Sequence, residues 1–293
     1  MSSIPRQLAT FAAVLAVLYT GGFIAGQFVE TGGHSGEGMG SAHAERDAGD
    51  GHAAGAAETP DVVRGLAVAE QGLRLVLATP ELEQGRRTEL RFSIVGRDGR
   101  PVRDFDVAHE KRMHLIVVRR DATGFQHLHP TLGRDGEWRA ASILEQAGTY
   151  RLFADFTRDG KPITLASDLR VDGDAQLEPL QVPRDVAAAG DGYEVRLHAG
   201  NPAAGREAEL AFTVTREGRP VRTEPYLGAG GHLVALREGD LAYLHVHPTD
   251  HGRDRTDVSF AATFPTEGRY RLFLQFKHRA RVHTAAFTQP VSR

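Results

Sequence analysis

Six histidines, arranged as two sets of three, are the residues of this chain whose types and spacing could do chemistry. The first set is His114, His127 and His129, and adding 118 to each number gives the second set, His232, His245 and His247. Neutral imidazole nitrogens are good ligands for zinc and copper, and three of them on a rigid support leave one coordination position open. The repeated pattern therefore predicts a metal site in each half of the chain.

A β-hairpin is the element that would bring each set together. An apolar alternating run that contains His114 is followed by a polar turn at Asp121–Gly124 and by a second run ending in His-x-His-Pro. Two such runs around a turn are typical of a hairpin whose second strand stops at proline. Residues two apart on a strand face the same way, so His127 and His129 would share a face, with His114 across the ladder from one of them.

The same histidines could instead have a structural or hydrogen-bonding role. Shared ancestry or packing could preserve them in both halves, because glycines and a Tyr-Arg-Leu-Phe strand are also kept. The thioether of Met113 would suit copper(I), but alternation turns it away from His114, so we expect Met113 in the core. Asp155 could orient a histidine and His109 could add a ligand from its loop, although both also fit exposed positions. His283 could contribute to the second site.

Two similar units make up most of the chain. Arg97-Asp-Gly-Arg-Pro-Val recurs as Arg216-Glu-Gly-Arg-Pro-Val, and Gly148-Thr-Tyr-Arg-Leu-Phe recurs as Gly268-Arg-Tyr-Arg-Leu-Phe. The first unit reads as about seven short strands with turn signals at roughly ten-residue intervals, as in an antiparallel immunoglobulin-like sandwich. We therefore predict an all-β fold with two tandem immunoglobulin-like β-sandwiches, the first at residues 61–174 and the second at residues 175–293.

The N-terminal part of the chain has a different composition. Residues 8–29 carry no charged side chain. This stretch is long enough to cross a membrane as a helix, which takes about 20 residues. Arg6 precedes this stretch and acidic residues follow it, which places the later residues outside the cell membrane. We predict a single-pass anchor at residues 1–30, with a cleaved signal peptide as the alternative, and a disordered Gly/Ala/His-rich tether at residues 31–60. The tether histidines could catch metal ions transiently or could simply be solvated; they are His34, His43 and His52.

The composition narrows the function classes further. The chain has 293 residues, a formal net charge of −3 and no cysteine. The weak charge gives no basic field for nucleic acid, so we expect no nucleic-acid partner. The lack of cysteine excludes thiolate metal sites and disulfides, so a metal would be held by His, Met, carboxylates or carbonyls. No phosphate loop, nucleophile elbow or His-Glu-x-x-His helix is present, and we do not predict an enzyme.

The first unit resembles exported bacterial YtkA-like and FixH-like immunoglobulin-like domains. The resemblance rests on the Lys-x-Met-His motif that ends at His114, on the His-x-His-Pro motif and on the strand Gly148-Thr-Tyr-Arg-Leu-Phe-Ala-Asp-Phe. These domains are associated with copper handling at the cell surface. The resemblance therefore implies copper at the first histidine set, with zinc as the second choice. In the second unit Gly230-Gly231 and Gln275 depart from the motifs, which implies a weaker second site.

Two functional hypotheses follow from these patterns. The first is a membrane-anchored extracytoplasmic protein that buffers or delivers copper through the two histidine sets, with another exported metal-handling protein as its partner. The second is an extracytoplasmic protein-protein interaction module in which the histidines only stabilise hairpins. A metal-dependent enzyme would also need a substrate pocket, which the sequence does not reveal.

Overall fold

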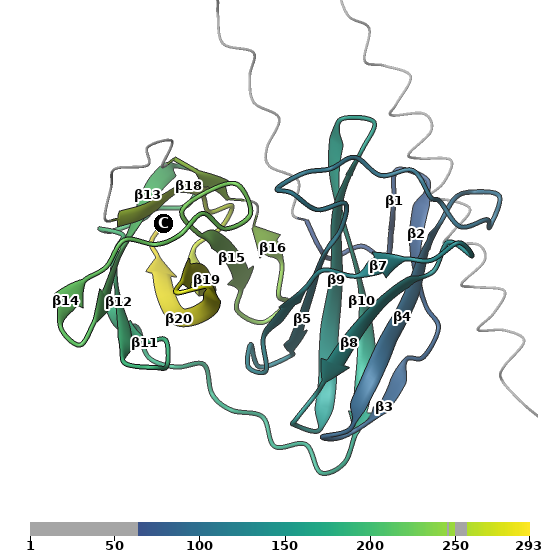
Figure 1. Ribbon diagram of the computed structural model, residues 1–293, viewed down its shortest axis with the longest axis horizontal. Coiled ribbons are helices and arrows are strands. Elements are labelled where there is room, and N and C mark those ends of the chain that lie inside the picture. The colour runs from purple at the N-terminus through teal and green to yellow at the C-terminus, as the bar shows by residue number, and fades with distance from the viewer. Residues whose placement is uncertain (1–63, 245, 250–256) are drawn as a thin grey trace, which may run out of the picture. The chain divides into compact units, whose positions relative to one another are not determined.

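The computed structural model describes residues 64–244, 246–249 and 257–293, and β-strand is the regular structure in these ranges (Figure 1). The predicted anchor at residues 1–30 and tether at 31–60 lie outside the described residues. Among the residues described, no helix has the length and apolar character needed to cross a bilayer. The predicted fold of two tandem immunoglobulin-like β-sandwiches is confirmed, because each repeat consists of two sheets around its own core.

The first repeat contains ten strands in two sheets. The strands are β1 (Ala69–Glu70), β2 (Leu73–Leu77), β3 (Glu81–Glu83), β4 (Arg87–Val95), β5 (His114–Arg119), β6 (Gln126–Leu128), β7 (Thr131–Leu132), β8 (Trp138–Ile143), β9 (Gly148–Arg158) and β10 (Lys161–Asp172). The sheet orders are β1-β2-β4-β8-β7 and β3-β10-β9-β5-β6. The core between the sheets includes Phe92, Trp138 and Tyr150, each at most 2% exposed.

The second repeat has the same two-sheet plan. Its strands are β11 (Val186–Ala188), β12 (Tyr193–His198), β13 (Glu207–Arg216), β14 (Arg219–Pro220), β15 (His232–Arg237), β16 (Tyr243–Leu244), β17 (His247–Pro248), β18 (Asp257–Thr263), β19 (Gly268–His278) and β20 (Arg281–Val291). One sheet has the order β11-β12-β13-β18-β17, with β14 beside β13, and the other has the order β16-β15-β19-β20. Phe212, Phe260 and Phe287 lie in the core between them.

Strand β5 of the first repeat is buried on both of its faces. Leu115 and Val117 point into the first core, where Met113 also lies as predicted, with 1% of its surface exposed. Ile116 and Val118 point to the opposite face and belong to a different apolar cluster. A strand that is apolar on both faces is one that is covered on both sides.

The cover on the outer face of β5 comes from the second repeat. The buried members of this shared cluster are Ile116, Val118, Ala122, Phe153, Ala166, Val234, Leu236, Leu241, Tyr243 and Phe273. The rings of Phe125 and Phe273 stack with centroids 4.1 Å apart, and the rings of Phe153 and Tyr243 lie 5.7 Å apart. Phe125 is equivalent to Tyr243 in the repeat, and Phe153 to Phe273. The contacts are therefore reciprocal, as in a two-fold interface.

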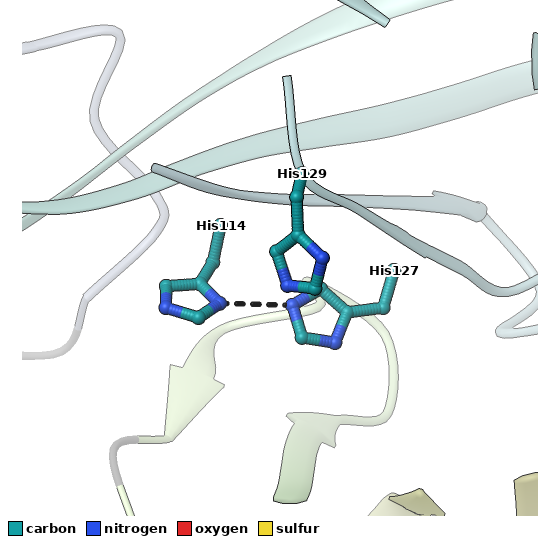
Figure 2. Close-up of side chains that lie close together, drawn as sticks. All are labelled: His114, His127 and His129. Atoms are coloured by element: carbon teal, nitrogen blue, oxygen red, sulfur yellow. Dashed lines mark hydrogen bonds between the residues drawn. The ribbon is translucent and has the colours of Figure 1, made fainter. Parts of the chain in front are cut away.

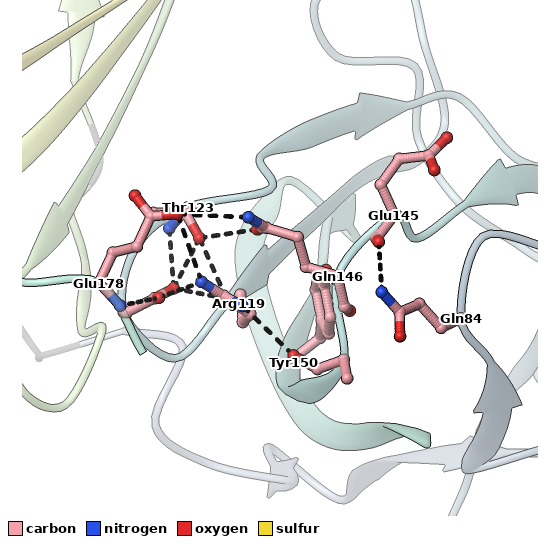
Figure 3. A network of polar contacts seen from close by, with 9 residues as sticks. Gln84, Arg119, Thr123, Glu145, Gln146, Tyr150 and Glu178 are labelled. Atoms are coloured by element: carbon pink, nitrogen blue, oxygen red, sulfur yellow. Dashed lines mark hydrogen bonds and ion pairs between the residues drawn. The ribbon is translucent and has the colours of Figure 1, made fainter. Parts of the chain in front are cut away.

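A buried ion pair fixes the turn between β5 and β6 (Figure 3). Arg119 is 2% exposed and donates hydrogen bonds to Asp121 Oδ1 at 2.9 Å and to the carbonyl oxygen of Ala147 at 3.3 Å. Thr123 Oγ1 also donates to Asp121 Oδ1, at 2.7 Å. Because loss of either partner would leave an uncompensated buried charge, this network holds the hairpin turn in one conformation.

Candidate metal centre

The β5–β6 hairpin brings the first histidine set onto one face. Ile116 pairs with His127 and Leu115 pairs with Leu128, so the continued register places His129 opposite His114. Directly opposed residues in an antiparallel ladder point the same way, which puts all three imidazoles on the outer face of β5. Figure 2 shows the three rings converging, and one ligand nitrogen from each lies within 4.8 Å of the others. The predicted convergence is confirmed for this set.

The three rings are packed closely enough to share one ion. The centroid of the His114 ring lies 5.2 Å from that of His127 and 5.3 Å from that of His129, and the last two centroids are 4.7 Å apart. His114 Nδ1 lies 3.0 Å from His127 Nε2. Two nitrogens bound tetrahedrally to one ion at ~2.0–2.1 Å would be about 3.3 Å apart. A widening of a few tenths of an ångström would therefore let this pair bind one ion, and the nitrogen of His129, which lies within 4.8 Å of the other two, would have to move closer to join it.

Carbonyl oxygens on either side set the protonation of this pair. His114 Nε2 lies 3.2 Å from the carbonyl oxygen of Ala108, and His127 Nδ1 lies 2.6 Å from Oε1 of Gln275. Gln275 Nε2 donates to Thr284 Oγ1, which turns Oε1 toward the imidazole. Both oxygens accept hydrogen bonds, so the tautomers that satisfy them carry the N–H on these two outer ring nitrogens.

The inner nitrogens of the pair are consequently unprotonated. A neutral imidazole carries one N–H, so His114 Nδ1 and His127 Nε2 present lone pairs to each other across 3.0 Å. Two facing lone pairs repel unless a cation, either a proton or a metal ion, lies between them. Carbonyl groups that anchor the outer N–H of a histidine and orient its other nitrogen are the usual second partners of metal-binding histidines.

Burial disfavours the proton as that cation. Loss of water around the charged ring is the largest cause that lowers the pKa of His114 to about 4 and the pKa of His127 to about 3. Burial likewise lowers the pKa of His129 to about 4, helped by repulsion from His114. All three imidazoles are therefore neutral at pH 7, the state in which they bind metal ions.

The third histidine also presents a nitrogen without a partner. His129 Nε2 is buried and has no hydrogen-bond partner among the described atoms. Buried polar atoms in folded proteins are nearly always paired, so each orphan needs an explanation. Ligation of an ion shared with His114 and His127 would supply one.

A strained turn supports the site from the loop before β5. His109 and Glu110 have positive φ angles of 47° and 64° between the mutually hydrogen-bonded residues Ala108 and Lys111. Side-chain-bearing residues rarely adopt this conformation, which costs roughly 1–2 kcal/mol each. The turn places the carbonyl oxygen of Ala108 against His114. It also places the exposed His109 ring 6.1 Å from that of His114.

The second histidine set is not arranged like the first. His232 begins β15, and its ring lies 4.8 Å from that of His127, in the first set. His247 begins β17, pairs with Ala261 in the other sheet of the second repeat, and is exposed. His245 lies outside the described residues, so the second site stays a prediction.

Sequence reasoning missed several residues of this site. Gln275, the carbonyl group of Ala108 and the approach of His232 were not predicted as parts of the first cluster. The available signal was that β5 is apolar on both faces, which indicates a cover on its outer side. Asp155 accepts a hydrogen bond from Thr164 Oγ1 at 2.7 Å and pairs with His114 in the β5–β9 register. His283 packs against Tyr193 in the second repeat.

Comparisons with solved structures gave matches at low sequence identity and low TM-score. The adhesin FdeC of Escherichia coli matches with a TM-score of 0.27 and 14% identity, over 78% of this chain and 66% of the adhesin chain. An alpha-2-macroglobulin of Salmonella matches with a TM-score of 0.28 and 14% identity, over 80% and 15% of the two chains. The adhesin InvE of Yersinia pseudotuberculosis matches with a TM-score of 0.24 and 13% identity, over 75% and 59%. This chain thus spans less than two thirds of the length of each of them.

No curated protein matches the chain. A family model described as "Domain of unknown function (DUF8832)" matches residues 67–173 and again residues 187–293. The two matches correspond to the two sandwiches and together include more than half of the sequence. The chain therefore belongs to the DUF8832 family and carries two tandem copies of its domain.

Proposed function

We propose that the chain binds one transition-metal ion through His114, His127 and His129. The observation that carries the proposal is the pair of facing ring nitrogens, which are 3.0 Å apart, while carbonyl oxygens lie within hydrogen-bond distance of the outer nitrogen of each ring. Low histidine pKa values keep the site free of protons at neutral pH, so an ion need not displace them.

Copper is the proposed metal, with zinc as the second choice. Three neutral imidazoles suit both ions, and nitrogen sites bind copper(II) more tightly than the other divalent first-row ions. The resemblance of the Lys-x-Met-His and His-x-His-Pro motifs to YtkA-like and FixH-like domains also favours copper. The proposed role is buffering or delivery of the ion outside the cell membrane, with residues 1–30 as the anchor and another exported metal-handling protein as the partner.

Isothermal titration of the purified full-length protein with Cu(II) and Zn(II) tests this proposal. The wild type should bind with Kd below ~10 μM, and the triple variant His114→Ala/His127→Ala/His129→Ala should lose that binding. His198→Ala is the matched control. His198 is exposed on β12 and hydrogen-bonds Thr213 on the neighbouring strand β13, in a different sheet from the candidate metal site. Wild-type binding weaker than this limit, or equal binding by the triple variant, would refute the proposal.

A protein-protein interaction module with structural histidines is the second candidate. The contact between His127 and Gln275 favours it, because that hydrogen bond links the two repeats without any metal. In this case His127→Ala would lower the melting temperature of the metal-free protein, and adding metal to the wild type would not raise it.

A further inference from the structure

A histidine of the second repeat lies against the candidate metal centre. The His232 ring is stacked on the ring of His114, with centroids 5.5 Å apart and an interplanar angle of 11°. It is also stacked on the ring of His127, at 4.8 Å and 27°. Imidazoles from both repeats therefore occupy one small volume, in which the first repeat contributes three and the second contributes one.

The His232 side chain lies beside the three-nitrogen group but outside it, because in the described part of the chain only His114, His127 and His129 have ligand atoms within 4.8 Å of one another. Its Nε2 atom is buried and, among the described residues, has no hydrogen-bond partner. His129 Nε2 is in the same condition in the same cluster. Two buried orphan nitrogens within one cluster of rings are costly in a protein interior, and a shared cation would satisfy both once the His232 ring turns out of its stack toward the other three.

The space beside His232 is small and partly polar. A cavity of about 20 Å³ is lined by His232, His109 and Asp155 among others. That volume holds about one water-sized species. His114, His127 and His129 do not line this cavity, so it lies beside the three-histidine site, where the Asp155 carboxylate on its wall would offset part of the positive charge of a nearby ion.

We propose that His232 is a fourth ligand of the ion held by His114, His127 and His129, so that the ion fastens the two repeats together. This inference rests on the metal binding proposed above and names its further consequence. Four imidazoles complete the tetrahedral shell of a late transition-metal ion such as Cu(I) or Zn(II) and leave no open position for a substrate. The site then stores or transfers metal, and release of the ion is coupled to loosening of the contact between the repeats.

The test compares metal affinity in His232 variants of the full-length protein with the wild type. His232→Ala should weaken zinc binding at least ten-fold while leaving one ion per chain, since three ligands remain. His232→Gln, which keeps a polar side chain of similar length, should do the same. His198→Ala is the matched control and should leave the affinity unchanged, because the exposed His198 ring lies on β12 and hydrogen-bonds Thr213, outside the histidine cluster.

Amide hydrogen exchange shows whether the ion joins the repeats. Zinc should slow exchange in both β5 and β15 of the wild type, and only in β5 of the His232 variants. Unchanged affinity in a folded His232 variant would overturn the bridging role and leave the three-histidine site standing. No zinc binding by the wild type would remove both proposals. If both variants fail to fold, wild-type protection limited to β5 and β6 would still overturn the bridging role.

Discussion

In the first repeat β6 ends at Leu128, and His129 turns into the histidine cluster, whereas in the second repeat the equivalent His247 already belongs to β17 and pairs with Ala261 in the other sheet. The same His-x-His-Pro motif therefore has two outcomes. A strand that begins two residues earlier commits the second histidine to a different ladder and leaves it exposed. The motif alone therefore does not show whether its second histidine joins a cluster, because this depends on where the following strand begins.

The residues around the histidines, at the positions of His109 and Asp155, also differ between the two repeats. His109 in the strained turn of the first repeat is replaced by the buried, apolar Leu227 in the second. Asp155, which pairs with His114 in the ladder, is replaced by Gln275, which pairs with His232. Gln275 forms a hydrogen bond with His127 across the interface between the repeats. Gln275 and His232 of the second repeat thus lie against the histidine cluster of the first.

The largest difference in metal affinity should appear between the variants His127→Ala and His247→Ala. Loss of His127 removes a ligand and its link to Gln275, so metal affinity should fall by more than about 100-fold. Loss of the exposed His247 should change it less than two-fold. Titration of both full-length variants with Zn(II) measures the difference, and equal losses would show that the repeats contribute alike.

Gln275 offers a sharper test of support across the interface. Gln275→Leu removes the acceptor that fixes the N–H of His127, and groups of this kind typically contribute about 10–100-fold to metal affinity. Gln275→Glu should retain or increase the affinity, because a carboxylate accepts the same hydrogen bond more strongly. A competition titration against a chelator would measure both variants. No loss in the leucine variant would mean that the contact is only structural.

The pH dependence of the metal-free protein should report the histidine cluster. The folded-state pKa values of His114 and His127 lie below the unfolded value of 6.5 because of burial, so the unfolded chain binds more protons at acidic pH. The contribution of these histidines to the free energy of unfolding is therefore complete above pH 6.5 and is lost as the pH falls toward about 4, by at most ~1.4 kcal/mol per pH unit for each ring. Melting temperatures between pH 7.5 and 5 should fall in the wild type and fall less in His127→Ala. An equal slope in both proteins would contradict the account.

The smallest effect concerns an ion pair that the second repeat lacks. Arg151 lies 3.6 Å from Asp168 in the first repeat, whereas the equivalent Arg271 donates to Thr288 Oγ1. Burial lowers the pKa of Arg271, and no carboxylate among the described residues offsets it. Thr288→Asp should stabilise the protein by roughly 1 kcal/mol or less, since the guanidinium is already buried. A lower melting temperature in this variant would show that the pocket beside Arg271 tolerates no second charge.

The fold and the first histidine set could be predicted because they follow local periodicity. Alternation around His114 and the polar turn at Asp121–Gly124 set the hairpin and its register. The contribution of the second repeat could not be predicted in this way, because the apolar outer face of β5 indicates that a cover exists but does not identify the segment that supplies it. The turn at His109 and Glu110 also escaped prediction, since neither residue favours a positive φ.

The most direct measurement of the central claim is the number of imidazole ligands around the bound ion. X-ray absorption of the copper- or zinc-loaded full-length protein should show at least three imidazole nitrogens at ~2.0–2.1 Å, and four if His232 takes part. A shell made only of oxygen atoms, or one unchanged in the His114→Ala/His127→Ala/His129→Ala variant, would contradict the account.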